Sequence, residues 1–435
     1  MDTRIGSRFQ SRRSFIKTTS LGAAGMAAWA AHLRQTSAIA AQASGEVRLT
    51  GGAASPEEEE LLRQALETFQ QEFPDITVNY EPIAADYLVK LQTDIAAGNA
   101  ADVFYLQIEF AQDFMSRGVV LPIDDYMAAD GVSDSDYYPG LISAFKWEGQ
   151  TYGLPKDWSP LGMVYDTAAL EAAGASVPTT WDELREAGQA LLDANGMPGI
   201  VIDPNFDRFV MFLYQAGGNV TNEDVTAITL DAPEVTEALE FFYGLYQDGI
   251  TATSADVGAQ WPGDAIAQGL AAIVFEGNWM FPFLETNAPD LEYGVAEPPA
   301  GAQKGTPAFT VAYSIFNGTQ NPDAAWALVR YMTGPDGMAT WTSLGLAMPS
   351  RPDLADQWLE SFPEREPYIA AGEYATGVQY GPGGQNFSAD ANAILQSLFA
   401  GQIDTAEAQA QLVQAAHDDL TLVGESASPE ASPAS

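Results

Sequence analysis

Apolar residues recur along the first third of the chain with the periods of short strands and amphipathic helices. An apolar run at residues 47–50 predicts a strand. The next segment has apolar residues three or four positions apart until Pro74, which is typical of a helix that a proline ends. Because strands and helices alternate in this way, we expect a mainly parallel sheet with helices on both faces. The further elements predicted in this part are strands at residues 76–80 and 103–106 and helices at residues 87–97 and 109–117.

The same alternation starts again after Asp166. Capping boxes at residues 55–58 and 180–183 mark two of the helix starts. Two successive α/β units predict two lobes, and the gap between lobes is a common place for a small ligand. This second part is predicted to hold helices at residues 166–174, 181–194 and 233–247, strands at residues 199–202 and 271–275, and a short helix opened by Trp279.

The N-terminal segment is interpreted as an export leader. Residues 12–17 contain a twin-arginine pair, a phenylalanine and a lysine, and a weakly apolar run and small residues follow. We expect cleavage after Ala43, so that residues 1–43 are a twin-arginine signal peptide and the mature protein is exported already folded. At the other end, residues 424–435 are rich in Ser, Pro, Ala and Glu, which predicts a disordered tail.

Composition favours a folded and strongly acidic protein. Hydrophobic residues make up 46% of the chain and charged residues 18%, which is enough apolar material for a large core. The net charge is −41, and it becomes −46 without residues 1–43, because six basic residues and one acidic residue leave with them. Nucleic acid and anionic membranes are not expected as partners, since binding phosphate needs clustered cations. The acid excess fits a salty or acidic habitat, and it fits equally a surface that is simply kept soluble.

Several kinds of chemistry are excluded by the residue types. The chain has no cysteine, which rules out disulfides, zinc–thiolate sites and cysteine nucleophiles. After the leader only His417 remains among the histidines, so neither a His-dependent triad nor a multi-histidine metal site is expected. No phosphate loop or Gly-x-Ser-x-Gly elbow occurs. We therefore expect no catalytic residues, no metal and no cofactor, although a glycosidase would need only two carboxylates about 5–9.5 Å apart.

Aromatic residues gather at expected loops and element ends beside polar residues. Sugars present C–H faces edged by hydroxyl groups, so a sugar site needs rings to stack on and polar groups around them. Trp158 and Trp279 are the strongest candidates because Asp157 and Asn278 flank them at turns. For any one of these rings a place in the core is the commoner alternative. The aromatic candidates are Tyr105, Trp158, Phe206, Trp261, Trp279, Tyr313, Trp341 and Tyr380.

Six segments of the chain resemble, in the same order, the signatures of one family. That family is the extracellular solute-binding proteins of carbohydrate ABC importers, family 1, which are maltose-binding-protein-like. The resemblance covers about residues 46–423. The segments are Ala-Asp-Val-Phe-Tyr at 101–105, Gly-Leu-Pro-Lys-Asp-Trp-Ser at 153–159, Pro-Thr-Thr-Trp-Asp-Glu-Leu at 178–184, Gly-Leu-Ala-Ala-Ile-Val-Phe-Glu-Gly-Asn-Trp at 269–279, Asn-Pro-Asp-Ala-Ala-Trp at 321–326 and Met-Pro-Ser-Arg at 348–351.

The resemblance implies a periplasmic-binding-protein-like α/β fold, with two α/β lobes around a hinge and a ligand cleft between them. The chain would cross between the lobes more than once, and hinge closure would capture the ligand. The expected parts are an N-lobe first part at 44–157, a C-lobe first part at 158–308, an N-lobe second part at 309–355 and C-terminal helices on the C-lobe at 356–423.

The resemblance also implies ligand-binding positions. Tyr105 matches a first-lobe stacking ring, Trp279 matches a second-lobe ring, and Ser159 falls where the crossing segment contacts ligand. Glu109 stands where the maltose binder has an Asp-Arg pair, and the early Asp-Lys pair has no counterpart around residues 53–55, so maltose itself is not expected. The full candidate set is Trp279, Trp158, Tyr105, Asp157, Tyr380, Ser159, Asn205, Phe206, Asp207, Trp261, Tyr313, Glu109, Gln385 and Arg351.

The expected function is that of an exported receptor, not an enzyme, which captures a sugar or oligosaccharide and delivers it to an ABC permease. We expect a periplasmic or extracellular monomer without a lipid anchor, because the cysteine that would carry the lipid is missing. Two alternatives stay open. One is a secreted glycoside hydrolase, and the other is a binder of a polyamine or another small solute, which is disfavoured because the acidic residues are spread over helix faces.

Overall fold

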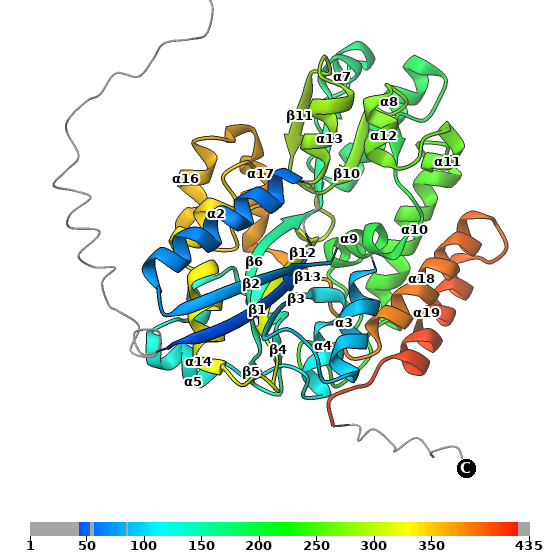
Figure 1. Cartoon of the computed structure of the whole chain (residues 1–435). Helices are drawn as coiled ribbons and strands as arrows, with labels where there is room; N and C mark the ends of the chain where they lie inside the picture. The colour runs from blue at the N-terminus through cyan, green and yellow to red at the C-terminus, as the bar shows by residue number, and fades with distance from the viewer. Residues whose placement is uncertain (1–42, 53–55, 84–85, 425–435) are drawn as a thin grey trace, which may run out of the picture.

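The computed structural model describes residues 43–52, 56–83 and 86–424, and they form two lobes, each built on its own β-sheet (Figure 1). Residues 1–42 of the predicted leader, the predicted tail beyond Gly424 and Ser55, which begins the first predicted capping box, lie outside the described residues.

The sheet of the first lobe is mixed, although the three strands predicted from the first third of the chain pair in parallel as expected. Strand β1 pairs in parallel with β2 and β3, whereas β12 runs antiparallel to β3 and β6. The order is β13-β12-β3-β1-β2, with β6 also paired to β12. The antiparallel pairs arise where the chain returns from the second lobe. The strands are β1 (Gly45–Gly51), β2 (Ile76–Pro82), β3 (Val103–Gln107), β6 (Gly153–Pro160), β12 (Thr306–Ile315) and β13 (Ala375–Gly377).

The sheet of the second lobe has the order β11-β7-β10-β8-β9. Its strands β10, β8 and β9 are parallel, and β7 is antiparallel to both β10 and β11. These strands are β7 (Gly162–Asp166), β8 (Ile200–Val201), β9 (Thr251–Ala252), β10 (Ile273–Glu276) and β11 (Tyr293–Ala296). A separate hairpin joins β4 (Lys146–Trp147) to β5 (Gln150–Thr151).

Local sequence explains most helix positions. Helix α10 runs over Pro233–Gln247, as predicted, because proline suits its first turn and its apolar stripe is buried. At the start of α8 (Trp181–Asn195), Thr180 accepts a hydrogen bond from the backbone N–H of Glu183. The Glu183 carboxylate bonds Thr179 instead of Thr180, so only half of the predicted capping box forms.

The other helices cover the sheets. Those of the first lobe are α2 (Pro56–Glu72), α3 (Tyr87–Ala96), α4 (Ile108–Ser116), α5 (Asp124–Asp130), α6 (Pro139–Ser143), α14 (Pro322–Met332) and α15 (Pro335–Trp341). Those of the second lobe are α7 (Thr167–Ala173), α9 (Phe206–Ala216), α11 (Ser254–Val257), α12 (Pro262–Ala267), α13 (Met280–Asn287), α18 (Gly384–Phe399) and α19 (Thr405–Asp419). The short helices α16 (Ala355–Leu359) and α17 (Glu366–Ala370) lie in the segment between α15 and β13.

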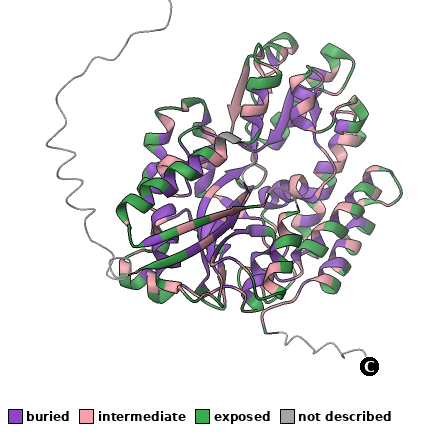
Figure 2. Ribbon diagram, viewed as in Figure 1, coloured by how far each residue is buried: buried purple, intermediate pink, exposed green. Residues whose placement is uncertain are grey.

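Three segments connect the lobes. Strand β6 continues into β7 of the second sheet, β12 brings the chain back, and β13 adds to the first sheet before the chain enters α18. Each lobe has its own apolar core around its sheet, with buried residues on the strands and exposed residues on the outer helix faces (Figure 2). A third apolar cluster, which includes Leu141 of α6 and Val274 of β10, joins the two lobes beside the connecting segments.

Candidate functional site

The cleft between the lobes lies at the carboxyl ends of strands from both sheets. On the first lobe, Gln107 ends β3 and Glu109 lies in the first turn of α4. On the second lobe, Asn278 and Trp279 follow β10. Ligands of open α/β sheets bind at such strand ends. The cavity measures about 250 Å³ and is lined by Glu58, Gln107, Glu109, Asp157, Trp158, Ser159, Asn278, Trp279, Phe309, Thr310, Val311, Leu346 and Ala347.

Trp279 offers an open indole surface to this cavity. The residue is 39% exposed, although most large apolar side chains of the chain are buried. Its Nε1 donates a hydrogen bond to Glu276 Oε2 at 2.9 Å, and the ring meets Phe309 edge-on with centroids 5.5 Å apart. At Gly277 a Cβ atom would stand 2.2 Å from the indole ring. The ring is thus held in one orientation and still has a surface to cover, which suits a platform for a ligand.

The ion pair of Glu276 and Arg208 is buried next to that tryptophan and holds its Nε1 edge in place. Glu276 is fully buried, and its Oε1 accepts from Arg208 at 2.6 Å. Burial raises the pKa of Glu276, while the charge and the hydrogen bond of Arg208 lower it. An unpaired carboxylate would be costly at this depth, so Arg208 of α9 makes the position of Glu276 possible. Sequence reasoning missed this pair because its members are far apart along the chain.

Ser159 and Asn278 tie the crossing strand to the second lobe. The Ser159 hydroxyl donates to the carbonyl of Pro160 at 2.9 Å and accepts from the backbone N–H of Asn278 at 2.7 Å. The Asn278 amide donates to the carbonyls of Gly345 and Leu346. Ser159 lines the cavity, and its hydroxyl oxygen can accept one more hydrogen bond, so its expected contact with ligand stays a prediction.

Asp157 lines the cleft and is paired with the buried ammonium group of Lys156. Its carboxylate accepts from Lys156 and, at 2.8 Å, from Trp341 Nε1. The Lys156 ammonium group lies 4.7 Å from the ring centroid of Tyr105 and 4.0 Å from that of Trp341. Two rings and a carboxylate therefore compensate this buried charge. The predicted aromatic Trp341 acts here by holding Asp157.

Glu109 stands at the rim of the cleft, opposite acidic groups of the second lobe. Its side chain is open to solvent, but the cleft walls surround the carboxyl group, and this desolvation raises the pKa of Glu109 to about 7. The negative charge of Asp207 contributes to the same shift. Burial also raises the pKa of Asp207, against the charge of its neighbour Arg208. Carboxyl groups of opposite lobes therefore interact across the gap.

Trp158 borders the cleft but belongs largely to a core. It is 2% exposed, its Nε1 donates to the carbonyl of Pro349 at 3.0 Å, and its ring lies 5.3 Å from that of Tyr138. Although Trp158 lines the cavity, almost none of its surface is open to it. Its prediction as one of the two strongest rings for stacking on a ligand therefore needs correction, because the surrounding core covers the ring.

Four other predicted rings are in the cores. Tyr105 and Tyr313 are opposite each other on β3 and β12, with ring centroids 5.2 Å apart. Phe206 and Tyr380 pack edge-on, 5.5 Å apart, in the core of the second lobe. All four are nearly inaccessible to solvent. They were predicted as ligand contacts, and the structure corrects this prediction because neighbouring strands and helices cover both faces of each ring.

The last predicted residues lie away from the cavity. Asn205 caps α9 by accepting from the backbone N–H of Arg208. Trp261 packs against Phe283, Arg351 bonds Asp353, and Gln385 is exposed in the first turn of α18. None of these four lines the cavity. The resemblance placed Asn205 and Gln385 near a ligand, and Trp261 was a candidate as an aromatic residue at an expected loop; helix capping explains Asn205 here and packing explains Trp261.

Several lining residues were missed. Gln107 directly follows a predicted strand, so its place at a carboxyl end could have been inferred from sequence. Phe309, Thr310 and Val311 lie inside β12, where periodicity does not show which strand borders a cleft. Among the described residues, no group of three or more His, Cys, Asp or Glu side chains could hold a metal ion. A search of the same residues found no helix long and apolar enough to span a membrane.

Two α/β lobes, joined by crossing strands around a cleft with an open aromatic surface, define a protein that binds a small solute. A sequence model of bacterial extracellular solute-binding proteins matches residues 53–339, and the chain belongs to that family. The expected fold class and family are thereby confirmed.

Named relatives agree with this assignment. A binding protein of Brucella abortus (strain 2308) is 30% identical over 335 residues, which are 72% of this chain and 79% of the relative. The maltotriose-binding protein of Pyrococcus abyssi (strain GE5 / Orsay) is 26% identical over 285 residues, which are 64% of this chain and 60% of that protein. A receptor of Streptomyces glaucescens, solved unliganded and with acarbose, has 25% identity and a TM-score of 0.73, and the match covers 87% of this chain and 98% of the receptor.

Proposed function

We propose that this protein captures a sugar or oligosaccharide in the interlobe cleft and delivers it to an ABC permease. The observation that carries the proposal is Trp279, an indole fixed through a buried ion pair and still 39% exposed in the cleft. A ring of this kind stacks on the C–H face of a sugar, while carboxylate and amide groups bond its hydroxyl rim. The names of the maltotriose-binding relative and the acarbose-bound neighbour support the same ligand class.

The lining residues have separate roles in this proposal. Trp279 supplies the stacking face from the second lobe, and Gln107 and Glu109 supply polar atoms from the first lobe. Asp157 accepts hydroxyl hydrogen bonds while Lys156 holds its position. When the lobes close, the sugar loses water on both sides, and each polar contact strengthens as solvent leaves.

The place of action follows from the same proposal. The twin-arginine pattern at residues 12–17 supports export of a folded chain, and the strongly negative charge supports a monomer that repels its copies. A fusion of residues 1–43 to a reporter that folds in the cytoplasm would be exported, and replacing the two arginines with lysine would stop the export.

A glycoside hydrolase remains the second candidate, and Glu109 is the reason. A carboxyl group with a pKa near 7 can act as a general acid at neutral pH, and Asp157 lines the same cavity. The structural neighbours are binding proteins, which favours capture without turnover.

A direct experiment separates the two functions. A thermal-shift screen of mono- and oligosaccharides identifies a ligand, and calorimetry measures its affinity. The same saccharide is then incubated with the protein for a day and analysed by chromatography. We expect binding with full recovery of the saccharide. Hydrolysis that Glu109→Gln abolishes would contradict the receptor function.

A further inference from the structure

A second cavity opens between the lobes, away from the cleft that holds Trp279. It measures about 880 Å³, and no residue lines both cavities. Helix α4 contributes to both walls on the first lobe: Glu109 lines the cleft, and Gln112, one turn further along, lines the second cavity. On the second lobe the two cavities are lined by different segments, Asn278 and Trp279 at the cleft and residues 219–226 at the second cavity.

The second-lobe wall of this cavity is the loop of residues 219–226, which its own hydrogen bonds hold in shape. Asn222 Oδ1 accepts from the backbone N–H groups of Thr226 and Ala227, and Asn222 Nδ2 donates to Thr226 Oγ1 at 2.8 Å. The carbonyl of Val225 accepts from the backbone N–H of Val423 at 2.8 Å. These hydrogen bonds fix the shape of the loop.

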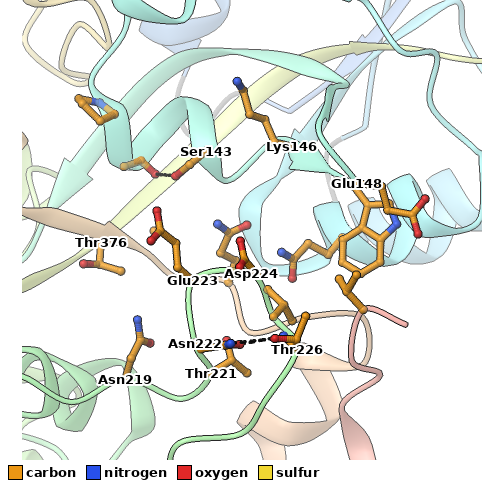
Figure 3. A pocket seen from close by; sticks show the side chains of 18 of the residues that line it. Ser143, Lys146, Glu148, Asn219, Thr221, Asn222, Glu223, Asp224, Thr226 and Thr376 are labelled. Carbon is orange, nitrogen blue, oxygen red and sulfur yellow. Dashed lines mark hydrogen bonds between the residues drawn. The ribbon is translucent and has the colours of Figure 1, made fainter. Parts of the chain in front are cut away.

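This loop presents acidic side chains to the cavity. Figure 3 shows Glu223 and Asp224 extending from the loop toward the first-lobe wall, where Lys146 and Glu148 lie. Among the lining residues Lys146 is the only cation, and its ammonium group is already paired with Asp134, which does not line the cavity. The lining therefore carries an uncompensated negative charge.

Two amide oxygens at the cavity lack hydrogen-bond partners. Gln112, on α4 of the first lobe, is 5% exposed, and its Oε1 has no partner among the described residues. Gln379, which follows β13, is half-buried, and its Oε1 likewise has no hydrogen-bond partner among the described residues. Both oxygens are covered by neighbouring atoms in this structure. A buried acceptor without a donor costs free energy, so a ligand whose N–H groups meet these oxygens as the amide groups turn is favoured. The indole of Trp147 lines the same space and can pack against a cationic nitrogen.

We propose that this second interlobe cavity binds an organic cation with two or more ammonium groups, at a site separate from the sugar cleft. Glu223 and Asp224 hold one ammonium group from the second lobe, and Gln112 and Gln379 accept from another. The walls belong to both lobes, so occupancy depends on how the lobes are oriented. By thermodynamic linkage, the cation and the sugar then influence each other's affinity.

The test is calorimetric titration of the full chain with spermidine at constant ionic strength. We expect one saturable site in the unmodified protein. E223Q/D224N should weaken binding about tenfold for each carboxylate removed. The matched control is E237Q/E240Q on α10, which changes net charge equally at exposed positions and should leave the affinity unchanged. Equal weakening in both double variants would mean general attraction to an acidic surface and would overturn the proposal.

Two further measurements sharpen the result. Gln112→Leu removes the unpaired amide and should weaken spermidine binding, with circular dichroism to check that the variant folds. Trp279→Ala should leave spermidine binding unchanged, so a failure of the sugar proposal and a failure of this one are distinguishable. A different result would contradict the proposal. If a neutral saccharide binds, spermidine does not bind, and E223Q weakens the binding of the saccharide, then the cavity binds a different class of ligand.

Discussion

Trp279→Ala removes the open aromatic surface of the cleft, and the structure sets the size of the effect. A tryptophan offers up to about 250 Å² of surface. The 39% that remains exposed is then about 100 Å², and covering it at about 25 cal/mol/Å² contributes about 2.5 kcal/mol. That free energy corresponds to roughly a 70-fold weaker dissociation constant for the sugar. The loss should appear mainly as faster release.

The same change has a smaller effect on folding. Glu276 loses the hydrogen bond from Trp279 Nε1 but keeps Arg208, so we expect a cost of about 1–2 kcal/mol in unfolding free energy. The melting temperature should fall by a few degrees only. Trp279→Phe separates the two contributions, because it keeps an aromatic face and removes the N–H donor.

Calorimetry with the best saccharide from the thermal-shift screen measures the affinity of each variant. Trp261→Ala is the matched control, since this tryptophan packs against Phe283 outside the cavity and its loss should leave the affinity unchanged. An unchanged dissociation constant in Trp279→Ala, or an equal loss in Trp261→Ala, would refute the assignment of Trp279 as the platform.

Three further changes test the surroundings of this ring. The pKa of Glu109 is higher in the folded protein than in the unfolded chain, so its contribution to folding stability is present at low pH and is lost as the pH rises through about 7. Glu109→Gln should therefore raise the melting temperature at pH 8 but not at pH 5. Gly277→Ala should displace the Trp279 ring, shift its fluorescence and weaken sugar binding by tenfold or more, on the order of the cost of an overpacked contact. Arg208→Met leaves Glu276 buried and unpaired and should cost about 3–5 kcal/mol in chemical denaturation, which adding Glu276→Gln should largely restore.

Local sequence predicted several helices and strand ends correctly, although α5, α9 and α14 were not among the predicted elements. The stripe of apolar residues and the N-terminal proline of α10 depend only on near neighbours, and the predicted bounds agree with Pro233–Gln247. The turn before Trp279 was likewise visible, because Gly277 and Asn278 interrupt an apolar strand. Such features result from backbone propensities and side-chain spacing within a few residues.

Strand partners depended on the whole chain. The alternation predicted a mainly parallel sheet, but β6 leads into the second lobe, β12 returns from it, and these two strands pair antiparallel. Tyr105 lies on a strand that the sequence predicted, whereas Tyr313 lies on β12, which was not predicted, and the burial of both rings depends on β12 lying beside β3. The sequence of either segment alone does not indicate which strand will pack against its tyrosine ring.

The sequence by itself determined the family signatures, the acidic character and the aromatic residues that could meet a ligand. Only the tertiary structure decided which aromatic residue stays open. Trp279 keeps its exposed face because Glu276 and Arg208 hold its edge, whereas Trp158 loses its faces to Tyr138 and the surrounding core. The physical reason is that exposure depends on contacts between segments distant in the chain, and a residue type cannot encode those contacts alone.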